Sequence, residues 1–152
     1  MRKIYHLKNK NFLYTNHDTE SLLNEQNSLL VMLRFSVYLL GSSMALALGG
    51  VLLFGKVPLL LTAGTLVVVV VLFLLAIAIE KSKDKRLIRA GVILALLSII
   101  TSSISSAHRE ALAQFGKNAY LTELDVLMIL GFYVFPLAYI VDWAFLPRRS
   151  KV

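Results

Sequence analysis

Long apolar runs, rather than alternating or amphipathic patterns, dominate this chain. A bilayer core is about 30 Å thick, and roughly 20 apolar residues cross it as a helix. Only helices and closed barrels satisfy every backbone amide in lipid, and continuous apolar runs fit helices. The pattern therefore predicts an all-α, polytopic integral membrane protein with four transmembrane helices, at approximately 30–54, 57–79, 90–107 and 124–145.

The second run contains five consecutive valines, Val67 to Val71. In water such a stretch would indicate a buried strand. Within an apolar run of membrane-spanning length, a helix is favoured because it satisfies its own hydrogen bonds in lipid. We therefore predict that these valines are helical.

The apolar runs divide the chain into three parts. Residues 1–29 form a polar segment, 30–146 the four-helix transmembrane domain, and 147–152 a basic tail. Asp18 or Thr19 could cap a helix within the first part. Residues 1–29 are thus expected to be partly helical, either as a stem continuous with the first span or as a segment lying on the membrane surface.

The connections between the predicted spans contain turn and capping residues. Gly55 and Pro58 predict a tight turn between spans one and two. Between spans three and four, the third helix is expected to continue to a C-cap near Gly116. Thr122 and Asp125 resemble a capping box for the fourth helix, with Asp in place of the usual Glu.

Composition agrees with a membrane protein: 57% of residues are hydrophobic and 16% are charged. Soluble domains are about 45–50% apolar and about 25% charged. The chain has no cysteine, which excludes disulfides, zinc–thiolate sites, iron–sulfur clusters and thiol catalysis.

The net charge of +7 is distributed unevenly about the predicted spans. Thirteen Lys and Arg residues fall in the N-terminal segment, the link between spans two and three, the tail and at position 34. Only Lys56, Arg109 and Lys117 fall on the other side. The positive-inside rule then predicts both termini on the cytoplasmic or equivalent inner side, and the short connections predict an up-down bundle.

Basic residues that flank apolar runs indicate membrane topology rather than nucleic-acid binding. The expected partners are the lipid bilayer, anionic lipid head groups at the inner face, and other membrane subunits or copies of this chain. No nucleic acid is expected. The expected location is a bacterial inner membrane, or a plasma or organelle membrane.

Two charged residues, Arg34 and Asp142, lie several residues inside the predicted spans. Arg34 is about four residues inside span one, roughly 6 Å, and can snorkel to the interface. Asp142 lies at a similar depth in span four, and helices one and four of an up-down bundle are neighbours. The sequence thus predicts an intramembrane Arg34–Asp142 ion pair, with snorkelling, Glu80 as partner, and proton or cation binding by Asp142 as alternatives.

Hydroxyl groups are concentrated in span three. Ser98, Ser102 and Ser105 fall on one helical face, and His108 and Arg109 follow it. Two interpretations are open: close packing with hydrogen bonds to helical carbonyls, or a wet vestibule that opens outward.

Small and ring-containing residues mark places where helices approach or bend. Gly41, Ala45 and Gly49 have the small-xxx-small spacing of close helix packing, against either the same chain or another protomer. Pro136 removes a backbone donor in span four and is expected to kink it. Tyr139 and Trp143 fit an aromatic belt at the inner face.

Chemistry-bearing motifs are absent from the sequence. No phosphate-binding loop, zinc-protease motif or nucleophile elbow occurs, and no pair of the histidines has metal-ligand spacing. We expect no enzyme activity, catalytic residue, cofactor or metal. The predicted function is a non-enzymatic subunit, assembly factor or self-associating component of a membrane complex. The alternative is an oligomeric channel or small transporter with the span-three serines lining its vestibule.

Overall fold

The computed structural model describes residues 2–57, 59–82 and 84–146, with side chains from Thr19 onward except at 20, 24 and 61. Within these ranges every regular element is a helix. The basic tail, Lys83 and Pro58 lie outside the described residues, so the predicted roles of Pro58 and the tail stay predictions.

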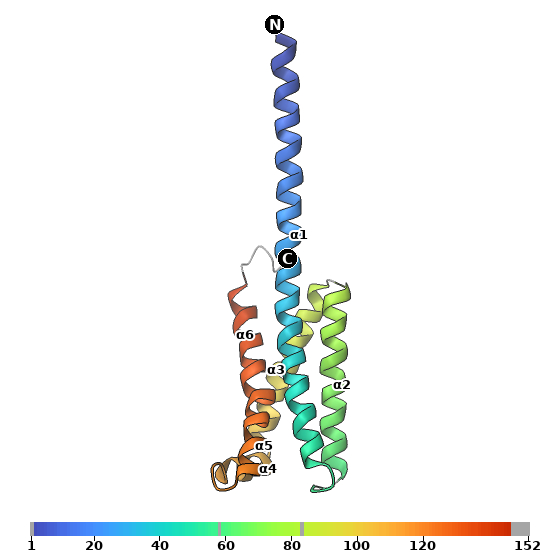
Figure 1. Ribbon diagram of the computed structural model, residues 1–152. Helices are drawn as coiled ribbons and strands as arrows, with labels where there is room; N and C mark the ends of the chain where they lie inside the picture. Colours follow the sequence, from blue (N-terminus) through green and yellow to red (C-terminus); the bar gives the residue numbers. More distant parts are fainter. Residues whose placement is uncertain (1, 58, 83, 147–152) are drawn as a thin grey trace.

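The polar N-terminal segment and the first apolar run form one helix, α1 (Arg2–Leu53). Its 52 residues make a rod of about 78 Å at 1.5 Å per residue. Figure 1 shows α1 extending well beyond the other helices. The predicted helix start at Asp18 or Thr19 is wrong, because no proline or glycine interrupts the chain before Gly41. The segment is therefore a stem continuous with the first apolar run.

The second helix, α2 (Leu59–Ser82), contains all five valines, which confirms that they are helical. Gly55, in the turn that precedes α2, has a φ of +75°. Glycine adopts this left-handed conformation without steric penalty, which explains the tight turn there.

The third apolar run is divided into two helices, α3 (Lys85–Ile104) and α4 (Ser106–Ala113). The Asp84 carboxylate caps α3 by accepting a hydrogen bond from the Arg86 N–H at 2.8 Å, so this helix begins five residues before the predicted span. At Ser105 the backbone becomes extended, and its hydroxyl accepts a 3.4 Å hydrogen bond from the His108 N–H. A continuous helix toward Gly116 was expected and is wrong, because the Ser105 side chain caps a new helix instead.

The fourth apolar run forms α5 (Ala119–Ile129), a π-helical turn η1 (Leu130–Val134) and α6 (Phe135–Phe145). The Asn118 side chain caps α5 by accepting a hydrogen bond from the Tyr120 N–H at 2.9 Å. The predicted Thr122–Asp125 capping box is therefore wrong. Thr122 instead donates to the Asn118 carbonyl at 2.8 Å, and Asp125 lies buried within the helix.

Helix α1 packs against α2 on one side and against α5, η1 and α6 on another. Helix α3 packs mainly on α6 and also contacts α2 and η1. The buried core includes Phe35 and Tyr139, whose ring centroids are 4.8 Å apart. Tyr139 is 1% exposed and its hydroxyl donates a 3.0 Å hydrogen bond to the Ile88 carbonyl. Its predicted place in an interfacial belt is therefore wrong.

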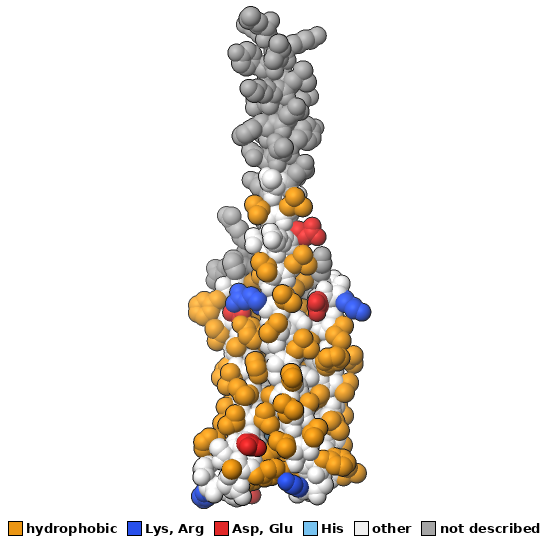
Figure 2. Space-filling view, viewed as in Figure 1, with side chains coloured by type: hydrophobic (Ala, Val, Ile, Leu, Met, Phe, Trp, Pro, Cys, Tyr) orange, Lys and Arg blue, Asp and Glu red, His pale blue; other side chains and the backbone are white. Residues whose placement is uncertain are grey.

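Four helical stretches are long and apolar enough to cross a membrane: Ser21–Leu53, Thr62–Ser82, Lys85–Ile104 and Ala119–Phe145. Large apolar side chains are exposed along all four. Figure 2 shows hydrophobic side chains over the sides of the packed part and charged side chains toward its two ends. This distribution is the one expected of helices that cross a membrane.

Candidate functional site

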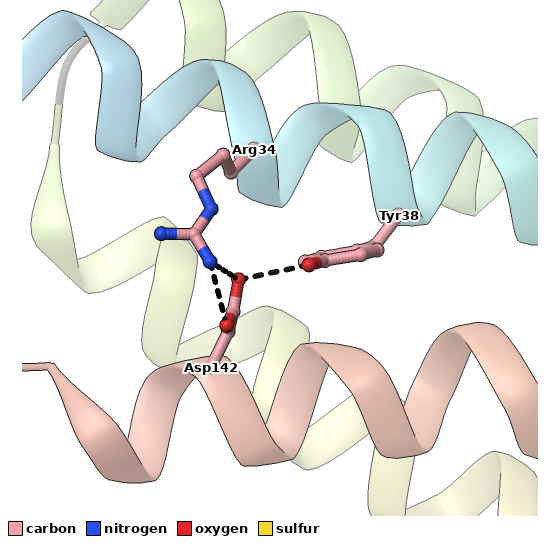
Figure 3. A network of polar contacts seen from close by, with 3 residues as sticks. All are labelled: Arg34, Tyr38 and Asp142. Carbon is pink, nitrogen blue, oxygen red and sulfur yellow. Dashed lines mark hydrogen bonds and ion pairs between the residues drawn. The ribbon is translucent and has the colours of Figure 1, made fainter.

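The structure brings Arg34 of α1 and Asp142 of α6 into direct contact (Figure 3). The Arg34 Nη2 donates to Asp142 Oδ1 at 2.8 Å and to Oδ2 at 2.6 Å. The Tyr38 hydroxyl, one turn further along α1, donates to Oδ2 at 2.9 Å. The carboxylate thus accepts three hydrogen bonds from two α1 side chains.

Arg34 shows features of both main interpretations, the ion pair with Asp142 and a side chain that snorkels toward the interface. Its side chain is 61% exposed, as a snorkelling arginine requires, while the Asp142 side chain is only 22% exposed. Glu80, the alternative partner, is exposed on α2 and is not the carboxylate that pairs with Arg34. Tyr38 was not predicted as a third member, although its position one turn after Arg34 places it on the same side of the helix.

The small residues of α1 explain how α1 and α6 come close enough to pair. A Cβ built on Gly41 would lie 2.6 Å from the Phe135 ring, and one on Gly49 would lie 3.9 Å from Leu127 Cβ. Ala45, between them, is buried. The small-xxx-small face therefore seats span four of the same chain.

Two other glycines in close contacts were not singled out from the sequence. A Cβ on Gly131 would meet the Leu46 side chain at 2.6 Å, and one on Gly91 would overlap the Tyr139 hydroxyl. Gly91 and Ala95 have the same small-xxx-small spacing, a signal in the sequence that was overlooked. Gly131 has no small residue four positions away, so its close contact is evident only from the packing.

A π-helical turn immediately precedes Pro136, which is itself buried. Proline lacks an N–H, and its ring conflicts with the carbonyl four residues earlier in a regular helix. The wider turn over Leu130–Val134 removes this conflict. The irregularity expected at Pro136 is thus located in the turn before it.

The five predicted vestibule residues do not share one cavity. A cavity of about 320 Å³ lies between the spans and includes Ser98 in its lining, but none of the other four. Its walls are mostly apolar and come from all four candidate spans. Of the other four, Ser102 is buried, Ser105 caps α4 and Arg109 is exposed.

Most of the neighbouring α3 hydroxyls bond to the helix itself. Thr101 donates to the Leu97 carbonyl at 2.7 Å, and Ser103 donates to the Ile99 carbonyl at 2.7 Å. The Ser103 hydroxyl also lies 3.2 Å from that of Tyr133. These contacts favour the close-packing interpretation of the hydroxyl-rich face.

A second polar group lies where α3 gives way to α4. Ser102 Oγ and His108 Nδ1 are 2.8 Å apart, and the His108 ring packs on Phe132 with centroids 5.1 Å apart. Burial lowers the pKa of His108, and a hydrogen bond with the backbone of Ser102 partly opposes that effect. The imidazole is therefore favoured in its neutral form.

Asp125 is the residue of most interest that the sequence did not identify as a site. It is 1% exposed, and its Oδ2 has no hydrogen-bond partner. Its position three residues after Thr122 suggested a cap, which concealed its burial. Within the described residues, no group of three or more His, Asp or Glu side chains could hold a metal ion.

Fold and contacts define a class of protein: an all-helical chain with four helices suited to crossing a membrane. Comparisons with protein-family models, curated proteins and solved structures find no match to this chain. Evidence about its function therefore comes from its own sequence and structure.

Proposed function

We propose that this chain is a four-span integral membrane protein with an up-down bundle and both termini on the inner side. In this arrangement it acts as a non-enzymatic subunit, assembly factor or self-associating component of a membrane complex. The exposed apolar sides of the candidate spans, from Leu33 onward on α1, support contact with lipid, because water would penalise so much exposed apolar surface. The first candidate span has 33 residues, more than the roughly 20 that cross a bilayer, so we assign its first part to the stem.

The observation that carries the proposed role is the unpacked stem of α1. Every described side chain from Thr19 to Leu30 is exposed, whereas packing against other helices begins at Val31 and Met32. Isolated helices are marginal in water because their nucleation is costly. A helical segment whose described side chains are all exposed, from Thr19 to Leu30, is therefore expected to gain stability from a partner.

Leucines on the stem indicate what such a partner would contact. Leu22 and Leu29 are 64% and 43% exposed, and Leu23 and Leu30 are 58% and 53% exposed. Each pair is separated by seven residues, the spacing of a coiled-coil seam. We infer that this face docks an amphipathic helix, from another copy or another subunit.

The cavity between the spans gives less support to a channel or transporter. Its mostly apolar walls provide no continuous polar path for an ion. Ser42, one of its polar residues, donates its hydroxyl proton to the Gly131 carbonyl at 2.6 Å. An acyl chain fits such a lining better than a hydrated solute.

A charge placed on the stem tests the proposed role. The double variant Leu22→Glu/Leu29→Glu is expected to dissociate the assembly, because charges in a helix seam are poorly tolerated. Ser21→Glu/Ser28→Glu adds the same charges at the same spacing on another face and is expected to preserve it. The readout is particle mass after cross-linking in native membranes and solubilisation. A native protein that is monomeric and partner-free in that measurement would contradict the proposal.

A further inference from the structure

The two aspartates of the fourth candidate span have opposite environments. Asp142 is partly exposed and accepts three hydrogen bonds, two of them from Arg34. Asp125 is 1% exposed, and its Oδ2 has no partner. The negative charge of the Asp125 carboxylate must therefore be removed in another way, because no hydrogen-bond partner offsets it at Oδ2.

The packing of α5 shows what covers Asp125. Tyr120 donates a short hydrogen bond to the Leu52 carbonyl, and Leu127 lies against Gly49, so these two side chains face α1. Asp125 is two residues before Leu127, about 200° around the helix, and so faces away from α1. Besides its continuation η1, the other described helix packed against α5 is α4. Asp125 is therefore buried on the side of α5 covered by α4 and the turn that follows it.

The charged groups on these surrounding elements do not neutralise Asp125. His108 on α4 is half-buried, but its Nδ1 lies 2.8 Å from Ser102 Oγ. Lys56 lies over the Tyr120 ring, 3.6 Å from its centroid. The remaining charged side chains of α4, the following turn and α5 are exposed: Arg109, Glu110, Lys117 and Glu123.

An ionised carboxylate buried without a partner is disfavoured, because burial removes its hydration and nothing replaces it. A bound cation could offset that cost, but Ca²⁺ takes six to eight oxygen ligands, and no group of three acidic or histidine side chains occurs among the described residues. A proton needs no such group. It removes the charge and leaves a hydroxyl at the oxygen that now lacks a partner.

We propose that Asp125 is a proton-binding site, a neutral carboxyl held under α4 in the outer half of the membrane domain. Intramembrane ionisable residues commonly mark proton-handling sites. The site requires the proposed membrane placement but not a partner for the stem. Failure of the stem experiment would therefore leave this proposal unaffected.

A hydrophobic carbodiimide tests the proposal because it reacts with protonated carboxyls. With dicyclohexylcarbodiimide, the carboxyl proton moves to one carbodiimide nitrogen and the carboxylate oxygen bonds to the central carbon. Acyl migration from oxygen to nitrogen then gives a stable N-acylurea, with no leaving group. In full-length protein in lipid vesicles at neutral pH, peptide mass spectrometry should find the adduct on Asp125 and not on ion-paired Asp142. Labelling should fall at alkaline pH.

Two amide variants give a second, independent readout. Asp125→Asn resembles the neutral carboxyl and should keep the native melting temperature while losing the adduct. Asp142→Asn disrupts a charged pair and should melt below the native protein. The proposal is overturned by an unlabelled Asp125 at neutral pH, by labelling that persists unchanged at alkaline pH, or by equal melting losses in the two variants.

Discussion

At the scale of single residues, the Asp142 carboxylate connects the first and fourth candidate spans near the C-terminal end of α6. Arg34 and Tyr38 reach it from successive turns of α1, and both carboxylate oxygens accept hydrogen bonds. The pair fixes the register of α1 against α6, because a shift by one turn would separate the charged groups.

A charge swap tests this register directly. Arg34→Ala and Asp142→Ala should each lower the free energy of unfolding by about 1 kcal/mol, a modest loss because Arg34 is 61% exposed. The double variant Arg34→Asp/Asp142→Arg should recover part of that loss. Thermal melting in detergent measures all three. Additive losses, with no recovery in the swapped protein, would show that the contact contributes no coupling.

The ion pair between Arg34 and Asp142 could be predicted from the sequence, whereas the burial of Asp125 without a partner could not. Arg34 and Asp142 could be matched because both lie about four residues inside predicted spans of known direction. Asp125 could not be recognised, because its burial depends on α4 folding over α5. The contact between α4 and α5 depends on the helix break at Ser105. Several Ser and Thr residues surround Ser105, so the position of the break could not be predicted from the sequence.

At the scale of helices, glycine contacts determine how closely α1 approaches the fourth span. Phe135 occupies the space that a Gly41 side chain would fill, and Leu46 occupies the space beside Gly131. The small-residue spacing on α1 indicated a packing face. Its partner could not be predicted, because the same spacing serves contacts within one chain and between chains.

Alanine at Gly41 tests this contact. Its Cβ would lie 2.6 Å from the Phe135 ring, so Gly41→Ala should destabilise the fold by about 1–3 kcal/mol through overpacking. Gly64→Ala is the matched control, because nothing lies within 4 Å of its Cβ. Alanine there should be neutral or stabilising by up to about 1 kcal/mol. Similar melting temperatures for the two variants would contradict the proposed packing.

At the scale of the whole molecule, helical class and the four apolar segments followed from the length of the hydrophobic runs. The limits of those segments were less accurate, because capping residues extend helices into polar sequence. Asp84 caps α3 and Asn118 caps α5, so each of these helices begins five residues before the predicted span. The stem followed only from the structure, since its apolar residues were too few to decide between a stem and a surface segment.

We propose that lipid surrounds four helices that each cross the membrane, and that the basic residues determine which end of each helix lies on the inner side. Since the chain has no cysteine, single cysteines report sidedness without background. The sites are Ser28→Cys on the stem, Lys56→Cys and Lys117→Cys in the two predicted outer turns, and Ser82→Cys at the C-terminal end of α2, which is predicted to lie on the inner side.

The decisive measurement is labelling of these four variants in intact cells with a membrane-impermeant thiol reagent. Positions 56 and 117 should react from outside, while positions 28 and 82 should react only after permeabilisation. Reaction of all four sites from the same side, or of position 28 together with position 56, would contradict the four-crossing arrangement.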